Sequence, residues 1–149
     1  MIMERELPSK RVLNKARILH YEKELKTLLR RQLDKVEPGL VAADNGRERE
    51  VASGRIDITA RDADGNFVVI ELKAGPCPAG ALEQVLGYSS DLEEETGRLC
   101  RAVLVAASFS TRQRAAAKRA HDVHLVTYQV EPMLTPKQAQ RPKSDLKGG

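Results

Sequence analysis

One segment of this 149-residue chain, RIDITARDADGNFVVIELKAG at residues 55–75, constrains the fold more than any other. Two apolar-rich stretches flank a central Asp-Gly pair, which is the pattern of a β-hairpin. Asp57, Glu71 and Lys73 nevertheless fall inside the predicted strands. Because an unpaired buried charge costs several kcal/mol, we expect these groups to be paired or to bind a metal ion.

The length of the turn decides whether the two carboxylates meet. A two-residue turn at Asp64-Gly65 would place Asp57 opposite Leu72 and separate it from Glu71, because side chains alternate between the faces of a strand. A three-residue loop at residues 63–65, with Gly65 in the left-handed conformation, places Asp57 opposite Glu71. We expect this loop, or a bulge with the same effect, since directly opposed Cβ atoms lie about 4.5–5.5 Å apart.

The same register predicts the faces of both strands. It sets Arg55 opposite Lys73. It also gives each strand one aliphatic face, formed by Ile56, Ile58 and Ala60 on the first strand and by Val68, Ile70 and Leu72 on the second. The charged groups then gather at one end of the opposite face.

Two adjacent carboxylates repel, and one is driven neutral unless a cation lies between them. Mg²⁺ suits such a pair, because it takes oxygen ligands at roughly 2.0–2.1 Å and keeps several waters for substrate phosphates. Lys73 lies on the same face as Glu71, where its side chain can orient or deprotonate a water, or neutralise charge on a scissile phosphate.

The rest of the pattern predicts an α/β fold with a mixed sheet flanked by helices. The expected elements are a helix from Tyr21 to about Val36, short strands in LVAAD and REREV, the hairpin, a helix from Ala79 to about Glu95, a buried strand in LCRAVLVAA, a helix from Thr111 to about Ala120 and a strand in VHLVTYQV. We expect a basic arm at residues 1–20, one domain at 21–130 and a disordered tail at 131–149.

Composition narrows the function further. The net charge is +4 and aromatic residues make up 3 % of the chain. A mildly basic protein is compatible with a polyanionic partner, whereas so few aromatic residues argue against a platform that stacks bases. No run approaches the roughly 18 apolar residues of a membrane span, and the first residues lack the apolar stretch of a signal peptide, so we expect a cytoplasmic protein with no membrane partner.

The GRID motif, followed after thirteen residues by ELK, resembles the core motif of the PD-(D/E)xK nuclease superfamily, whose fold is restriction-endonuclease-like. A closer resemblance is to the C-terminal nuclease domain of the NucS/EndoMS mismatch endonucleases. The stretches VEPGL, QVLGY and RAVLVAASFSTRQRAAAKRAHDVHLVTY are also similar to that domain, so the resemblance covers residues 21–130.

The resemblance implies roles for the matching positions. Asp57 and Glu71 would bind Mg²⁺ or Mn²⁺, with the Leu72 carbonyl as a further ligand, and Lys73 would be the catalytic lysine. The chain would then be a divalent-metal-dependent DNA endonuclease that hydrolyses phosphodiester bonds in repair or defence. The alternative is a non-catalytic nucleic-acid-binding or regulatory module with the same fold.

Further residues are implied near the same site. Gln84 and Tyr88 match a QxxxY motif, and their spacing places both on one face of a helix. The family also tends to place a Glu of the first helix near the metal. Glu22 falls within the apolar stripe and Glu24 at its edge, so we favour Glu22, with Glu50 as a weaker candidate.

Basic residues are the candidates for contact with DNA, which the resemblance allows to be single-stranded, branched or a mismatched duplex. They are Arg55 before the hairpin and Arg112, Arg114 and Lys118 on the third helix, although a solvated basic face explains the helix equally well. The mismatch endonucleases carry a separate N-terminal domain that helps them dimerise and grip DNA. About twenty residues precede the core here, so a homodimer through its own surface and a partner protein both remain open.

Overall fold

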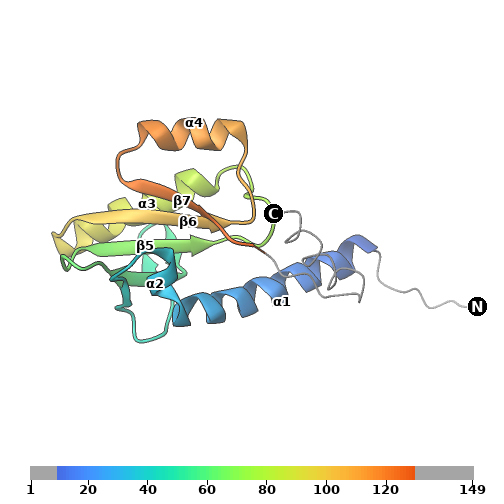
Figure 1. Ribbon diagram of the computed structural model, residues 1–149, viewed down its shortest axis with the longest axis horizontal. Coiled ribbons are helices and arrows are strands. Elements are labelled where there is room, and N and C mark those ends of the chain that lie inside the picture. The colour runs from blue at the N-terminus through green and yellow to red at the C-terminus, as the bar shows by residue number, and fades with distance from the viewer. Residues whose placement is uncertain (1–9, 130–149) are drawn as a thin grey trace, which may run out of the picture.

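The computed structural model describes the backbone of residues 10–129 and the side chains of residues 20–129. The expected tail at 131–149 and the start of the expected arm therefore lie outside the described residues. A five-stranded mixed sheet in the order β1-β4-β5-β6-β7 forms the centre of the molecule (Figure 1). Its strands are β1 (Val41–Ala42), β4 (Ile58–Arg61), β5 (Phe67–Leu72), β6 (Cys100–Ala106) and β7 (Val123–Thr127).

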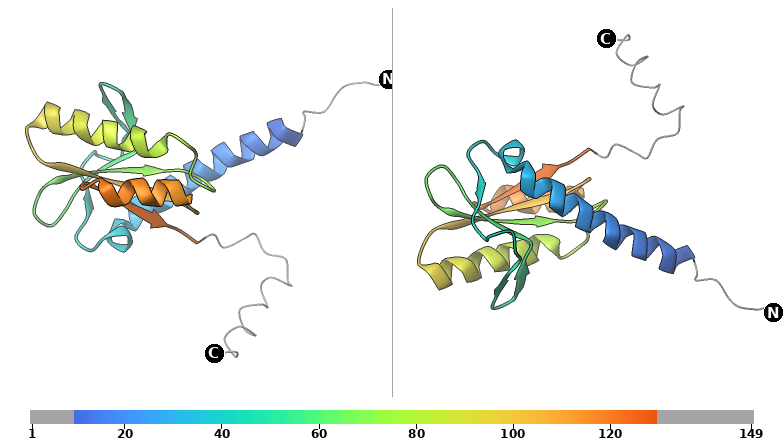
Figure 2. Two further views of the ribbon diagram at one scale, coloured as in Figure 1. Left: turned by 90° about the horizontal axis from the view of Figure 1, so that it is seen from above. Right: turned by 90° about the horizontal axis from the view of Figure 1, so that it is seen from below.

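Helices cover both faces of this sheet, as Figure 2 shows. The helices α1 (Lys10–Arg31) and α2 (Leu33–Val36) pack on one face, and α3 (Ala81–Thr96) and α4 (Thr111–Arg119) on the other. The central strand β5 is buried along its whole length because it has a neighbouring strand on each side and a core on each face. The predicted α/β fold with a mixed sheet flanked by helices is confirmed.

The first helix differs from its prediction at both ends. It begins at Lys10 rather than Tyr21, and residues 10–20 contain no Gly or Pro that would interrupt it. It ends at Arg31 because Gln32 leaves the helical conformation, and α2 then turns Leu33 into the core. None of the described helices has the length and apolar character needed to cross a membrane.

The hairpin turn has the expected three-residue loop. Arg61 pairs with Phe67 at the last rung of the β4–β5 ladder, and the Asp62 amide donates a hydrogen bond to the Asn66 carbonyl. Gly65 has a φ of 85°, the left-handed conformation that such loops require of their last residue. The predicted register is confirmed from Ile58 to Arg61, so Asp57 lies next to Glu71.

The first hairpin strand is shorter than predicted, because the chain bends at Asp57. Residues before the bend form β3 (Gly54–Ile56), which pairs with β2 (Arg49–Val51) in a separate two-stranded ribbon. The expected pairing of Arg55 with Lys73 is therefore wrong, since Arg55 lies opposite Glu50.

The bend also moves Ile56 to the other side of the sheet. Ile56 packs in the core under α3, whereas Ile58 and Ala60 pack in the core under α1, so the predicted common face for these three residues is wrong. The physical reason lies in the backbone of Asp57. Its N–H donates to the Glu71 carboxylate and its carbonyl accepts from Arg30, so neither group is available to continue the ladder.

The remaining elements follow their predictions closely. The helix α3 begins two residues late, after Gly80, and its buried side includes Val85, Ser89 and Leu92. The helix α4 begins with a capping box in which Ser110 and Gln113 exchange hydrogen bonds. Strands β6 and β7 lie parallel to β5, as expected for strands joined by helices.

Candidate active site

The two predicted acidic residues meet at the carboxyl end of β5. The Asp57 amide donates a hydrogen bond of 3.1 Å to Glu71 Oε1, and the Leu72 amide donates one of 3.0 Å to Asp57 Oδ2. Each carboxylate thus accepts a hydrogen bond from a main-chain amide in the segment that carries the other carboxylate. This arrangement fixes both side chains before any ligand arrives.

Glu71 is held in an environment that disfavours its charge. Only 4 % of the residue is exposed. Burial and the neighbouring charge of Asp57 raise the pKa of Glu71 to about 7, although Lys73 works in the opposite direction. Lys73 Nζ lies 3.7 Å from Glu71 Oε2, so the structure brings Asp57, Glu71 and Lys73 together. A further cation near the two carboxylates would relieve their repulsion.

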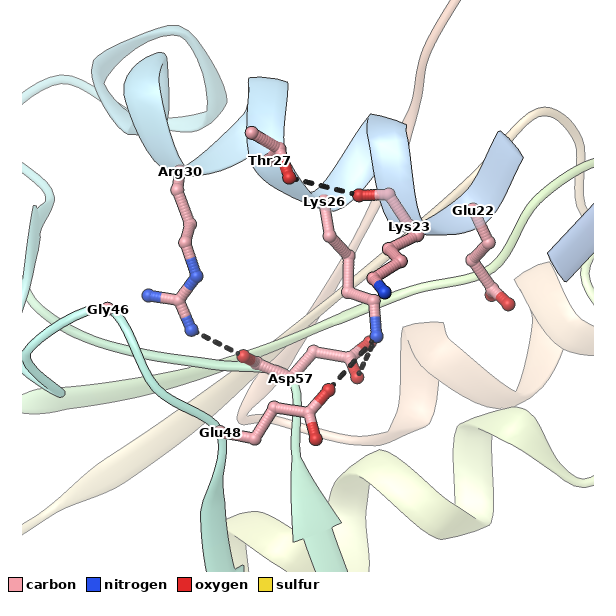
Figure 3. A pocket seen from close by; sticks show the side chains of 8 residues that line it. All are labelled: Glu22, Lys23, Lys26, Thr27, Arg30, Gly46, Glu48 and Asp57. Carbon is pink, nitrogen blue, oxygen red and sulfur yellow. Dashed lines mark hydrogen bonds and ion pairs between the residues drawn. The ribbon is translucent and has the colours of Figure 1, made fainter. Parts of the chain in front are cut away.

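One face of α1 forms the opposite wall of the site. Glu22, Lys26 and Arg30 follow one another at intervals of four residues and therefore share a face of the helix. They line a cleft of ≈570 Å³ that five residues of α1 form together with Gly46, Glu48 and Asp57 (Figure 3). Glu22 Oε2 accepts a hydrogen bond of 3.3 Å from the amide of Ala74, the residue after Lys73.

The other two candidate glutamates do not line this cleft. Glu24 is exposed and pairs with His20 at 3.3 Å. Glu50 is exposed on the ribbon, where it pairs with Arg55 at 3.0 Å. The structure thus places Glu22, the favoured candidate, beside the motif and the other two away from it.

Arg30 anchors the bend at Asp57. Its guanidinium binds both carboxylate oxygens of Asp44 at 2.7 and 3.0 Å and donates to the Asp57 carbonyl at 2.8 Å. Asp44 also accepts the amides of Gly46 and Thr59. Burial acts to raise the pKa of Asp44, but these hydrogen bonds, led by that from Arg30, lower it below its usual value.

Lys26 binds the second carboxylate of the site. Its ammonium lies 3.2 Å from Asp57 Oδ1 and 3.2 Å from Glu48 Oε2. Figure 3 draws both contacts as dashed lines. Burial works to lower the pKa of Lys26, but Asp57 and Glu48 outweigh it and the pKa is raised. Lys26 and Arg30 were not among the predicted site residues. The signal that could have found them is their spacing of four and eight residues from Glu22.

The two residues of the QxxxY motif lie in different environments. Tyr88 is buried in the core under α3, whereas Gln84 is exposed. The Tyr88 ring packs against Gly54, where an added Cβ would lie 2.6 Å from the phenolic oxygen and 2.7 Å from a ring carbon. The glycine of the GRID motif is therefore required by the ring of Tyr88.

The predicted DNA-contacting residues lie on two elements. Arg112, Arg114 and Lys118 are exposed on α4. The start of α4 adjoins the loop after Lys73, because Gln113 donates a hydrogen bond to the Cys77 carbonyl. Arg55 lies on the ribbon, with its guanidinium paired to Glu50 and Glu48.

The donor set fits a hard divalent ion. Within residues 20–129, no three His, Cys, Asp or Glu side chains form a ready-made metal cluster. Two carboxylates are sufficient for Mg²⁺, which usually binds one or two and keeps water in its other positions. Burial and the charge of Asp57 raise the pKa of Glu71, and a cation beside the pair would offset the part that comes from Asp57. Leu72 buries its side chain in the core under α1, and its amide donates a hydrogen bond to Asp57 Oδ2.

Comparison with known proteins places this site in a family context. The family model described as the endonuclease NucS C-terminal domain matches residues 21–145. Endonuclease NucS of Thermococcus kodakarensis is 36 % identical over 90 residues, covering 60 % of this chain and 35 % of that protein. Endonuclease NucS of Methanopyrus kandleri is 34 % identical over 93 residues, covering 62 % and 35 %. The aligned part spans about a third of the length of these relatives.

Solved structures show the same similarity. A complex of EndoMS with double-stranded DNA matches with a TM-score of 0.62 and 30 % identity, over 74 % of this chain and 46 % of that one. A repair endonuclease from Pyrococcus abyssi matches with a TM-score of 0.61 and 27 % identity, over 87 % and 50 %. Since the family model spans most of the chain and includes every motif residue of the site, this protein belongs to the endonuclease NucS C-terminal domain family.

Proposed function

We propose that this chain is a divalent-metal-dependent DNA endonuclease that hydrolyses phosphodiester bonds in DNA repair. The observation that carries the proposal is the meeting of Asp57, Glu71 and Lys73 at one end of β5. Similarity to proteins named as endonucleases, one of them a repair endonuclease, supports the reaction class. The similarity to an EndoMS complex with double-stranded DNA supports duplex DNA as the substrate.

The carboxylates of Asp57 and Glu71 would hold Mg²⁺ or Mn²⁺, together with the Leu72 carbonyl. When bound, such an ion polarises a phosphoryl oxygen and lowers the pKa of a bound water. Lys73, beside Glu71, would orient the attacking water or neutralise charge on the scissile phosphate. Glu22 would support Lys73 by holding the amide of the next residue, Ala74.

The remaining candidates would position the substrate and the site. Tyr88 and Gly54 pack against each other and so hold the ribbon against α3, while Gln84 lies one turn away on the exposed side. Arg112, Arg114 and Lys118 on α4, and Arg55 on the ribbon, would contact phosphates.

A cleavage assay with variants of the site tests the proposal. Labelled single-stranded, fully paired, mismatched and branched DNA, and duplex RNA, are incubated with the protein and either Mg²⁺ or Mn²⁺. Asp57→Asn and Lys73→Met should each lose about 100-fold or more in rate, the order expected when a group stabilising transition-state charge is removed. The controls Asp64→Asn and Lys35→Met change exposed charges outside the cleft and should cleave like wild type.

The same assay also distinguishes the alternative function, a non-catalytic DNA-binding module. Equal cleavage by wild type and both site variants would show that another site, or a contaminant, cuts the DNA. Binding without cleavage on every substrate would favour a non-catalytic DNA-binding module. Size-exclusion chromatography with and without duplex DNA tests whether the domain acts as a homodimer, and co-purification tests for a partner protein.

A further inference from the structure

Lys26 occupies a special place in the cleft, because it binds the one oxygen of Asp57 that faces α1. Asp57 Oδ2 already accepts the Leu72 amide, and Lys26 Nζ lies 3.2 Å from the other oxygen, Oδ1. Lys73 binds the neighbouring carboxylate, Glu71, on its own side. Each of the two carboxylates is thus paired with a different lysine.

The ammonium of Lys26 and a divalent ion are incompatible on the same oxygen. An ion bound at Asp57 Oδ1 would lie within a few ångströms of Lys26 Nζ, and like charges at that separation repel strongly in a partly buried site. Only 25 % of the Lys26 side chain and 13 % of the Asp57 side chain are exposed, so water screens the repulsion weakly.

A second acceptor for Lys26 is already in contact. Glu48 Oε2 lies 3.2 Å from the same ammonium, and the Glu48 side chain, which lines the cleft, is 40 % exposed. A modest rotation of the Lys26 side chain would retain the contact with Glu48 while releasing Asp57. The cleft that Lys26 lines has room for this rotation of its side chain.

We infer that Lys26 acts as an internal counter-ion, which neutralises Asp57 in the metal-free protein and transfers to Glu48 when a divalent ion binds. The metal affinity of the site depends on this exchange, because the incoming ion must displace the Lys26 ammonium from Asp57. This inference rests on the proposed metal site and adds a positioning residue to it.

Direct measurement of Mn²⁺ binding tests the inference without relying on cleavage. The full chain is titrated with Mn²⁺ by isothermal calorimetry, and free Mn²⁺ is followed by electron paramagnetic resonance. Lys26→Met should bind Mn²⁺ about tenfold more tightly than wild type, because the competing charge is gone. Lys23→Met removes the same charge from an exposed residue of the same helix and cleft, and it should change the affinity about twofold or less.

Glu48→Gln provides a second variant that leaves Lys26 in place. Without its second acceptor Lys26 stays on Asp57, so Mn²⁺ should bind about threefold more weakly in this variant. In the Lys26→Met background the same Glu48→Gln change should have little effect. An equal effect of Glu48→Gln in both backgrounds would overturn the transfer.

Thermal melting provides an independent readout. Metal-free Lys26→Met should melt below wild type, because Asp57 loses its counter-ion, and Mn²⁺ should raise its melting temperature by more than it raises that of wild type.

The failures of the two proposals are distinguishable. Wild type that binds Mn²⁺ as tightly as Lys26→Met would overturn the counter-ion role and leave the metal site standing. If Lys26→Met and Lys23→Met tighten Mn²⁺ binding equally, the effect of Lys26 is only that of a positive charge in the cleft. That result would also overturn the counter-ion role. No Mn²⁺ binding by any variant would overturn the metal site and the inference together.

Discussion

Glu71 is a carboxylate that the fold buries beside a second carboxylate, and this placement predicts a pH-dependent stability. The pKa of Glu71 is about 7 in the folded protein against 4.5 for the free group. Between these values the unfolded chain loses its proton while the folded chain keeps it. The contribution of Glu71 is therefore fully present below about pH 4.5 and is lost as the pH rises through 7.

Glu71→Gln should remove this pH dependence. Gln stays neutral and its carbonyl can still accept the Asp57 amide, so the variant should be more stable than wild type at pH 8, on the order of 1 kcal/mol. Urea unfolding of both proteins at several pH values without divalent ions measures the difference. Glu24→Gln, at an exposed position, is the matched control. If wild type and Glu71→Gln had the same stability relative to each other at every pH, this result would contradict a buried Glu71 with a raised pKa.

Gly54 and Gly87 make a paired test of the packing around Tyr88. A Cβ at Gly54 would overlap the buried Tyr88 ring, so Gly54→Ala should lose about 1–3 kcal/mol of unfolding free energy through overpacking. A Cβ at Gly87 in α3 meets only Ser53 Oγ at 3.6 Å, so Gly87→Ala should gain about 0.5–1 kcal/mol from helix propensity. Chemical denaturation measures both changes, and a neutral Gly54→Ala would show that the ring can move aside.

At the scale of elements, the hairpin illustrates what local sequence can predict. The three-residue loop followed from an Asp-Gly pair and from the need to bring Asp57 to Glu71, both visible in one short segment. The bend at Asp57 was not predictable in the same way. It depends on Arg30, 27 residues earlier, whose side chain takes the carbonyl that a strand would use.

The face of α1 also shows that local sequence does not predict contacts between distant segments. Apolar periodicity predicted the helix and pointed to Glu22 as an inward-facing acid. Lys26 and Arg30 share its face, but charged residues on a helix are usually solvated, and only the partners opposite them reveal a role. Those partners, Asp44, Glu48 and Asp57, lie on segments whose positions relative to α1 are set by the whole sheet.

Arg30 is therefore expected to stabilise the packing of α1 against the bend. Only 3 % of the Asp44 side chain is exposed, so Arg30→Met would leave a buried carboxylate without its partner. We expect a loss of about 3–5 kcal/mol, and partial recovery in the double variant Arg30→Met/Asp44→Asn, measured by urea unfolding. Arg31→Met, at the next and exposed position, should change stability by less than about 0.5 kcal/mol. A similar loss in both single variants would show that helix propensity, rather than the ion pair, is responsible.

At the scale of the whole molecule, the sheet order brings the site together. The parallel strands β5, β6 and β7 point their carboxyl ends to one edge, where the motif, the loop after Lys73 and the start of α4 adjoin. The family match extends to residue 145, beyond the domain end that we expected at residue 130. The Pro-, Lys- and Gln-rich composition beyond Glu131 set that expected end, because a segment of this composition has few apolar residues to contribute to a core.

This arrangement predicts which basic residues contribute to DNA affinity. Arg112 and Arg114 lie at the start of α4, near the proposed active site, whereas Arg98 lies by the hairpin tip, where it donates to the Gly65 carbonyl. Binding of duplex DNA is measured against salt concentration in an Asp57→Asn background, in which we expect cleavage to be lost. Arg112→Ala and Arg114→Ala should each weaken binding and reduce the slope of log K against log salt by about 1, the signature of one lost phosphate contact.

Arg98→Ala removes an equal charge from the opposite end of the sheet and should leave the slope unchanged. Because the net charge of the chain is only +4, a general attraction would be reduced similarly by every arginine variant. A local DNA-binding groove beside the proposed active site would instead respond only to changes in the residues that border it. Equal slopes for Arg98→Ala and Arg112→Ala would therefore place the DNA elsewhere on the surface. A reduced slope confined to Arg112→Ala and Arg114→Ala would make α4 the wall that guides the phosphate backbone toward Lys73.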